Sequence, residues 1–209
     1  KEMMGEEPYQ IVMLGDYVDR GPQSKEVVEF LMNAQDAGQN VICLKGNHED
    51  LMCKAFDDGA TYNWFSNGGA ETVASYDPMM GNVVKSMEKV SRAHIGWMRA
   101  LPTYHETEAH IFVHAGLRPG VLLRDQDPTE MMWIRDKFLY AFPEQFPDKK
   151  VIVHGHTPQH HPLKEDYTKP EVHDHRVNLD TAAYHCGILT VGKFERGNKD
   201  FVKVFAVTV

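Results

Sequence analysis

Four short apolar segments of this chain each end in a cluster of glycine and side chains that can bind a metal ion. The clusters are GDYVDRG after IVML (15–21), GNHED after VICLK (46–50), HAG after IFV (114–116) and HGHTP after VIV (154–158). Apolar segments of about four or five residues that stop at Gly, Asp, Asn or His are typical of buried strands. We therefore expect the clusters to lie at strand ends and to carry the chemistry of the protein.

The remaining pattern predicts one layered α/β domain over residues 1–209, with sheets packed between helices. Helices are expected at 22–37, at 49–56 and across 61–101, the last one broken at 67–69 and at Pro78. Further strands are expected at 104–107, 110–114, 151–154 and 176–180, and a hairpin at 187–207. A helix is expected to begin after Asp127. Three aromatic residues of the helical part are interpreted as core packing: Trp64, Phe65 and Trp97.

Composition and charge limit the classes of partner and the cellular compartment that we expect. The chain has a net charge of −8 and a pI near 5.8. Nucleic-acid binding depends on a basic face that releases counterions, so no nucleic-acid partner is expected. No apolar stretch approaches the roughly 18 residues of a membrane span, so no membrane partner is expected either. Three widely spaced cysteines without a CxxC pair favour a reducing cytoplasm.

The four clusters contain a mixed set of oxygen and nitrogen ligands. Asp16 offers a carboxylate that can bridge two cations, Asn47 an amide oxygen, and His114 and His156 imidazole nitrogens. This mixture suits Mn, Fe or Zn better than an all-oxygen calcium cage. Two such ions about 3.5–4 Å apart can clamp a phosphoryl oxygen and acidify a bridging water. The set therefore indicates attack of hydroxide on phosphorus.

Three further residues in the same clusters suit the other half of that reaction. His48 directly follows Asn47 and can protonate a leaving oxygen, and Asp19 is a candidate partner that favours its imidazolium form. Arg20 has a planar fork that can hold phosphate oxygens. Nucleophile, acid and phosphate clamp are then all present in the sequence.

The motifs GDYVDRG, GNHE, HAG and HGHTP resemble those of the phosphoprotein phosphatases, the metal-dependent serine/threonine phosphatases of the calcineurin-like metallophosphoesterase superfamily. The segments WIR (133–135) and LDTAAYHCGILT (179–190) are similar to the small bacterial and phage branch. The resemblance implies a layered metallophosphoesterase sandwich of central mixed β-sheets flanked by helices. It also implies two divalent transition metal ions, with manganese first and iron or zinc as alternatives. Asp16 would bridge both ions, and the second would be held by Asn47, His114 and His156.

By the same resemblance, Asp19 and His48 would form the acid pair, and Arg20 and Arg135 would bind phosphate. The implied function is hydrolysis of phosphoserine or phosphothreonine by a metal-bridging hydroxide, with His48 as general acid. The implied partner is a phosphoprotein or a small phosphoester.

The sequence departs from the family pattern in two places. The GDxHG motif that supplies ligands to the first metal is absent and is expected upstream of Lys1, so we expect the domain to be N-terminally incomplete and weakly active. Where the family often has an aromatic residue before a Cys-Gly pair, this chain has His185, with Tyr184 before it. In HGHTP the ligand role is expected for His156, with His154 behind it. Four other histidines are expected to be solvated: His160, His161, His173 and His175.

Two other functions remain open at this point. One is a symmetrical dinucleoside tetraphosphate hydrolase, whose relatives share this fold but usually lack the residue corresponding to Asp19 and have GNHD where this chain has Glu49. The other is a non-catalytic phosphate-binding remnant, which would require that the first motif is missing from the gene.

Overall fold

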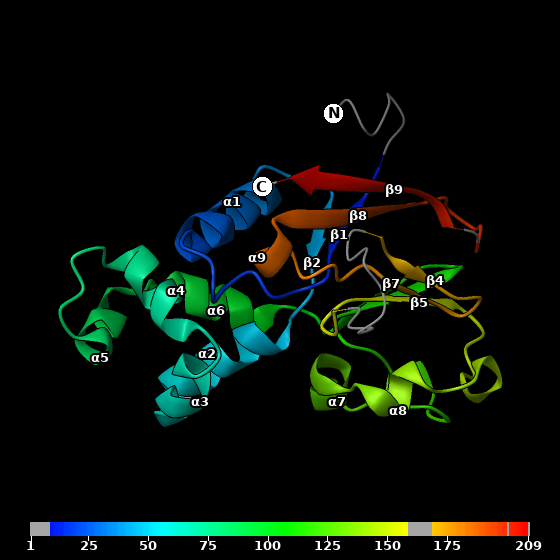
Figure 1. Ribbon diagram of the computed structural model, residues 1–209, viewed down its shortest axis with the longest axis horizontal. Coiled ribbons are helices and arrows are strands. Elements are labelled where there is room, and N and C mark those ends of the chain that lie inside the picture. Colours follow the sequence, from blue (N-terminus) through cyan, green and yellow to red (C-terminus); the bar gives the residue numbers. More distant parts are fainter. Residues whose placement is uncertain (1–8, 159–168, 200, 209) are drawn as a thin grey trace. The chain divides into compact units, whose positions relative to one another are not determined.

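The computed structural model describes residues 9–158, 169–199 and 201–208, so expectations about His160, His161 and residues 1–8 lie outside the described residues (Figure 1). The chain divides into two compact units, one formed by residues 1–44 and 48–102 and the other by residues 45–47 and 103–209. The fold is of the α/β class, as the sequence predicted.

The first unit begins with a strand, a helix and a parallel strand. β1 (Ile11–Met13) pairs in parallel with β2 (Val41–Cys43), and α1 (Ser24–Asp36) connects them. The face of α1 that carries Val28 and Leu31 is buried, in the spacing that the sequence predicted. Gly38 ends this segment with a φ of 72°, a conformation that glycine adopts without strain. Both strands are shorter than expected.

The rest of the first unit is helical. Its helices are α2 (Asn47–Asp58), α3 (Thr61–Phe65), α4 (Gly69–Tyr76), α5 (Val83–Ser86) and α6 (Arg92–Ala100), with a 3₁₀ turn at Met87–Lys89. The breaks expected at 67–69 and Pro78 are confirmed. Trp64 is fully buried, and Phe65 and Trp97 pack against the same core, so all three aromatic residues pack in the core as expected.

The expected start of α2 at Glu49 is wrong by two residues. The helix begins at Asn47, and the backbone N–H of His48 donates to Asp16 Oδ1 at 3.2 Å. A carboxylate from a distant loop therefore satisfies a donor of the first helical turn, which otherwise has no partner within the helix. Sequence patterns detect caps on neighbouring residues and miss one supplied from elsewhere.

The buried carboxylate of Glu49 holds the loop that follows β1. Its Oε2 accepts the backbone N–H of Asp16 at 2.9 Å, and its Oε1 accepts that of Tyr17 at 2.7 Å. Glu49 has no solvent-exposed surface. One side chain thus satisfies two backbone donors of GDYVDRG.

The second unit contains a five-stranded mixed sheet of order β3-β4-β5-β7-β6. Its strands are β3 (Tyr104–Glu106), β4 (His110–Val113), β5 (Val151–His154), β6 (Glu171–Val172) and β7 (Arg176–Asn178). β4, β5 and β7 are parallel, and the two outer pairs are antiparallel. Parallel strands place their carboxyl ends at one edge of the sheet, which is where ligand sites form in such sheets.

Different elements cover the two faces of this sheet. Ile111 and Ile152 pack with Phe138 and Ile134 from the segment of α7 (Pro128–Trp133) and α8 (Asp136–Leu139). On the other face, Phe112 meets the ring of Phe194 edge-on at 5.7 Å. Phe194 belongs to the antiparallel hairpin of β8 (Ile188–Phe194) and β9 (Phe201–Thr208), which the sequence predicted. The remaining helical segments are Leu123–Asp125, Pro143–Gln145 and α9 (Ala183–Cys186).

Several local expectations hold in the second unit. Asp127 caps α7 by accepting the N–H of Thr129 at 2.7 Å, with Pro128 in the first turn. His173 is exposed as expected, but His175 is half-buried and stacks on Phe146 at 5.6 Å.

Among the described residues, no helix has the length and apolar character needed to cross a bilayer.

We predict that Glu49→Gln destabilises the protein. The amide presents one oxygen and one NH₂ group, so one of the two backbone N–H groups loses its acceptor and faces a donor. Leaving a buried donor unsatisfied costs about 1–3 kcal/mol in the free energy of unfolding. Urea unfolding measures this, with the exposed Glu88→Gln as the control variant. Equal stability of the two variants would contradict the role of Glu49.

A second prediction concerns stability in acid. Burial is the largest influence on the pKa of Glu171 and raises it, but hydrogen bonds from Arg176 and His173 together outweigh burial and lower the pKa from 4.5 to about 2. A carboxyl with a lowered pKa stabilises the fold above its unfolded value, and this contribution is lost as the pH falls from 4.5 toward 2. We therefore expect the melting temperature of Glu171→Gln to fall less between pH 4.5 and 2 than that of the unmodified protein. If the melting temperatures of Glu171→Gln and the control Glu88→Gln fall equally over this range, Glu171 contributes nothing.

Candidate functional site

The GDYVDRG loop leaves β1 in an unusual backbone conformation. Gly15 has a φ of 102°, and three residues with side chains also have positive values: Asp16 at 60°, Asp19 at 77° and Arg20 at 63°. Such residues cost free energy and persist only where surrounding contacts hold them. The loop exposes Asp16 and Arg20 and buries Asp19. The chain thus separates an accessible carboxylate from a buried one within four residues.

The buried carboxylate belongs to an ion pair. Asp19 Oδ2 lies 2.6 Å from Nδ1 of His48, whose side chain is 4% exposed, while that of Asp19 is fully buried. Burial is the largest influence on the pKa of His48 and lowers it. The hydrogen bond to Asp19 and the charges of Asp16 and Asp19 outweigh burial, so the pKa of His48 lies above its ordinary value. The pair therefore favours an imidazolium whose Nε2 remains available for donation.

Two residues that the sequence did not mark as functional hold the other oxygen of Asp19. Trp64 Nε1 donates to Asp19 Oδ1 at 2.9 Å, and Thr72 Oγ1 donates to the same oxygen at 2.7 Å. Thr72 Oγ1 also accepts the backbone N–H of Asp19 at 2.8 Å. The sequence marked Trp64 only as core, and it offered no signal for Thr72.

Arg20 is anchored through its backbone. Its N–H donates to the carbonyl oxygen of Gly68 at 3.1 Å, while its side chain is exposed. Gly68 has a φ of 101°, and a Cβ added there would lie 2.7 Å from Arg20 Cγ. Glycine is therefore required at position 68 for its conformation and for the close approach of Arg20.

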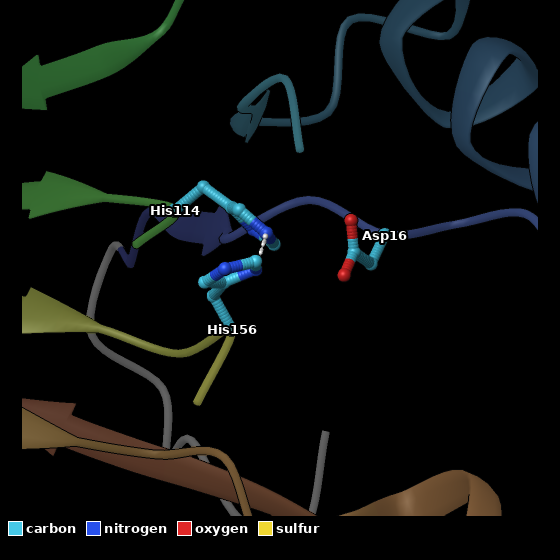
Figure 2. Close-up of side chains that lie close together, drawn as sticks. All are labelled: Asp16, His114 and His156. Carbon is cyan, nitrogen blue, oxygen red and sulfur yellow. Dashed lines mark hydrogen bonds between the residues drawn. The ribbon is translucent and has the colours of Figure 1, made fainter. Parts of the chain in front are cut away.

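In the second unit, three predicted ligands come together. His114 Nε2 lies 2.9 Å from Asn47 Oδ1 and 3.2 Å from His156 Nδ1. Figure 2 shows the hydrogen bond between the two imidazole rings, whose centroids are 5.0 Å apart. One amide oxygen and two imidazole nitrogens thus converge from three chain segments. This donor set fits a transition metal ion such as Mn, Fe or Zn.

Parallel strand ends and one further side chain position these ligands. His114 follows β4 and His156 follows β5, and the N–H of Gly155 donates to the carbonyl oxygen of His114 at 2.8 Å. Asn178, the last residue of β7, donates from Nδ2 to the carbonyl oxygen of Thr157 at 2.8 Å. Asn178 was not predicted from the sequence, although it carries the same signal as the others, a polar residue at the end of an apolar strand.

His154, the other histidine of HGHTP, packs in the core instead. It is fully buried, and its ring meets Phe138 edge-on at 4.8 Å. Burial first, and then the charge of Arg176, lowers the pKa of His154 to about 3. His154 is therefore a neutral core residue at neutral pH, and the HGHTP turn presents His156.

The remaining candidates lie at the surface. Arg135 is exposed, and its Nη1 donates to Thr157 Oγ1 at 3.2 Å, next to His156. Tyr184 is 65% exposed and lies with His185 in the short helix α9. The structure thus brings together Asp16, Asp19, Arg20 and His48 within the first unit, and Asn47, His114, His156 and Arg135 within the second. Asn47 and His48, one from each set, are consecutive residues of α2.

Curated relatives of the chain are named as hydrolases of phosphate compounds. The asymmetrical bis(5'-nucleosyl)-tetraphosphatase PrpE of Bacillus subtilis is 27% identical over 208 residues, covering 90% of this chain and 77% of the relative. The symmetrical bis(5'-nucleosyl)-tetraphosphatase of Aromatoleum aromaticum is 31% identical over 108 residues, covering 52% and 34%. The zinc-dependent endopolyphosphatase of Saccharomyces cerevisiae is 29% identical over 84 residues, covering 40% and 25%. The chain thus spans only a quarter to a third of the last two relatives.

Solved structures share the fold at low sequence identity. A putative diadenosine tetraphosphatase matches 95% of this chain and 80% of its own, with a TM-score of 0.64 and 16% identity. A protein serine/threonine phosphatase from Saccharomyces cerevisiae, with similarity to human phosphatase PP5, matches 96% and 70% with a TM-score of 0.59 and 15% identity. These matches support the metallophosphoesterase fold expected from the motifs.

A model of the calcineurin-like phosphoesterase family matches residues 2–187, which include all four strand-end clusters. The chain belongs to the calcineurin-like phosphoesterase family.

Proposed function

We propose that the protein is a metal-dependent hydrolase of phosphate esters or anhydrides. The observation that carries the proposal is the pair of ligand and acid on consecutive residues of α2. The Asn47 amide oxygen lies 2.9 Å from Nε2 of His114, which lies 3.2 Å from Nδ1 of His156, and the His48 imidazole pairs with the buried Asp19. One helical turn thus offers a metal ligand and a proton donor side by side.

The proposed metal ligands are Asp16, Asn47, His114 and His156. The converging amide oxygen and imidazole nitrogens support the assignment of Asn47, His114 and His156, and the zinc-dependent name of one relative agrees with a divalent metal. When bound, two such ions would neutralise phosphate charge and supply an acidified water as nucleophile. We propose manganese first, with iron or zinc as alternatives.

The chain's own side chains would perform the remaining steps. Asp19 engages Nδ1 of His48, so Nε2 is the atom that can protonate a leaving oxygen. Arg20 and Arg135 are exposed cations that would hold phosphate oxygens through their planar guanidinium groups. With a net charge of −8, the protein is proposed to act in the cytoplasm on small or protein-bound phosphates rather than on nucleic acid or at a membrane.

The first substrate candidate is a bis(5'-nucleosyl) tetraphosphate. Relatives that carry this name align with about nine-tenths of the chain, as the Bacillus subtilis protein does at 90%. The expectation that Asp19 and Glu49 argue against a tetraphosphate substrate concerned the symmetrical enzymes alone, whereas the relatives that align with nine-tenths of the chain are named asymmetrical.

The second candidate is phosphoserine or phosphothreonine. An alkoxide leaving group needs protonation, whereas a phosphate leaving group is already a weak base with a second pKa near 6. The buried Asp19–His48 pair therefore favours an ester with a poor leaving group. The serine/threonine phosphatase among the solved structures with the same fold supports keeping this candidate.

A substrate panel tests the proposal. Metal-stripped protein should hydrolyse neither diadenosine tetraphosphate nor a phosphothreonine peptide, and added manganese should restore turnover of at least one. Symmetrical cleavage gives two diphosphates, whereas asymmetrical cleavage gives a triphosphate and a monophosphate, so product analysis distinguishes the two. Iron and zinc are compared in parallel. If no metal supports hydrolysis of any phosphate compound while phosphate still binds, the protein is a binding remnant and the proposal fails.

We further predict that His48→Asn lowers kcat on an alkyl phosphate by about 10² to 10⁴, the usual contribution of a general acid. The loss should be smaller on p-nitrophenyl phosphate, because its phenolic leaving group needs less protonation. Metal content should stay unchanged, since His48 pairs with Asp19 and is not among the proposed ligands. The control variant is His173→Asn, an exposed histidine elsewhere. Equal losses on both substrates would remove the acid role.

A further inference from the structure

We propose that Trp64 and Thr72 are positioning residues that fix the Asp19 carboxylate so that His48 can act as the acid. The catalytic role in this proposal rests on the proposed function. Its structural basis is that both residues donate to Asp19 Oδ1, at 2.9 and 2.7 Å, while His48 takes Oδ2 at 2.6 Å.

The donors around Asp19 determine which hydrogen-bond partner each of its two carboxylate oxygens takes. An indole N–H can only donate, so Oδ1 must accept from Trp64. The Thr72 hydroxyl accepts the backbone N–H of Asp19, and its own hydrogen has two acceptors within reach, Asp19 Oδ1 at 2.7 Å and Ser24 Oγ at 3.2 Å. The nearer, charged carboxylate oxygen is the stronger acceptor. With Oδ1 engaged twice, Oδ2 is the oxygen directed at the imidazole. Rotation of the carboxylate would break two buried hydrogen bonds, and a buried polar atom left without a partner is costly.

The chain between the two donors is shaped to hold them. Trp64 lies in α3 and Thr72 in α4, and the turn between these helices contains Gly68 and leads into Gly69. A Cβ added to Gly69 would lie 2.6 Å from the Trp64 ring, so only glycine lets the helix approach the indole. Figure 1 shows α3 and α4 following each other in the first unit. The same turn accepts the backbone N–H of Arg20.

This segment therefore has a role beyond core packing. Trp64 and Thr72 are fully buried, as structural residues would be. Their polar atoms, however, both point at one carboxylate oxygen. A residue that serves packing alone would keep its role when the polar atom is removed and the shape is kept. Substitutions that conserve shape distinguish the two roles.

The test uses Thr72→Val, which removes the hydroxyl and keeps the shape, and Trp64→Phe, which removes the indole N–H and also leaves a cavity that the melting temperature reports. The control variants are Trp97→Phe, whose indole donates to Gln35 at 2.8 Å, and Thr190→Val, whose hydroxyl pairs with Thr181 at 2.8 Å. Thr72→Ser keeps the hydroxyl and should restore function. Melting temperatures confirm that each variant is folded.

We expect Trp64→Phe and Thr72→Val to lower kcat on an alkyl phosphate by about 10- to 100-fold, a part of what a general acid contributes, with KM unchanged. The loss should shrink on p-nitrophenyl phosphate, and the control variants should behave like the unmodified protein. Losses that are equal on both substrates, or that the controls share, would overturn the proposal.

A second readout does not depend on turnover. In the zinc-loaded, diamagnetic protein, the Nδ1 proton of His48 should resonate far downfield because of its short bond to Asp19. It should move upfield in Trp64→Phe and Thr72→Val and stay in place in Trp97→Phe and Thr190→Val. If the unmodified protein hydrolyses no phosphate compound, the proposed function fails while this resonance still decides the positioning. A resonance unchanged in all variants would overturn it.

Discussion

The first unit is organised around the buried carboxylate of Asp19 and the hydrogen bonds that satisfy it. A charge removed from water is tolerated only when hydrogen bonds and an opposite charge surround it. Here the partners come from α2, α3 and α4, through His48, Trp64 and Thr72. The requirement to satisfy one carboxylate therefore ties three helices to the loop after β1. The positive φ of Asp19 is held by the same contacts.

Glu49 and Asp16 connect that loop to the first turn of α2 in both directions. Glu49 accepts two backbone N–H groups of the loop, and Asp16 accepts the N–H of His48. The reciprocal bonds explain why a loop with several strained residues keeps a defined shape. They also keep Asp16 exposed while its neighbour Tyr17 is buried, which leaves the Asp16 carboxylate accessible for the proposed metal.

The second unit reaches its arrangement by another route. Three parallel strands end at one edge of the sheet, and each supplies a polar residue there: His114 after β4, His156 after β5 and Asn178 at the end of β7. Sheet geometry alone brings such residues together, because neighbouring parallel strands run in register. The two units thus contribute different chemistry. The first holds the buried Asp19–His48 ion pair, and the second gathers an amide oxygen and two imidazole rings.

The sequence by itself determined most elements and the places where chemistry would lie. Short apolar runs, glycine breaks and the Asp127 cap are local signals, and they placed the strands, the helix breaks and the proposed ligands His114 and His156. The tertiary structure alone decided what surrounds those residues. It extended α2 back to Asn47 through Asp16, and it directed Trp64 and Thr72 at a carboxylate that lies 45 and 53 residues away along the chain. Partners so far apart leave no periodic pattern in the sequence, because the free energy that joins them arises only when the helices pack.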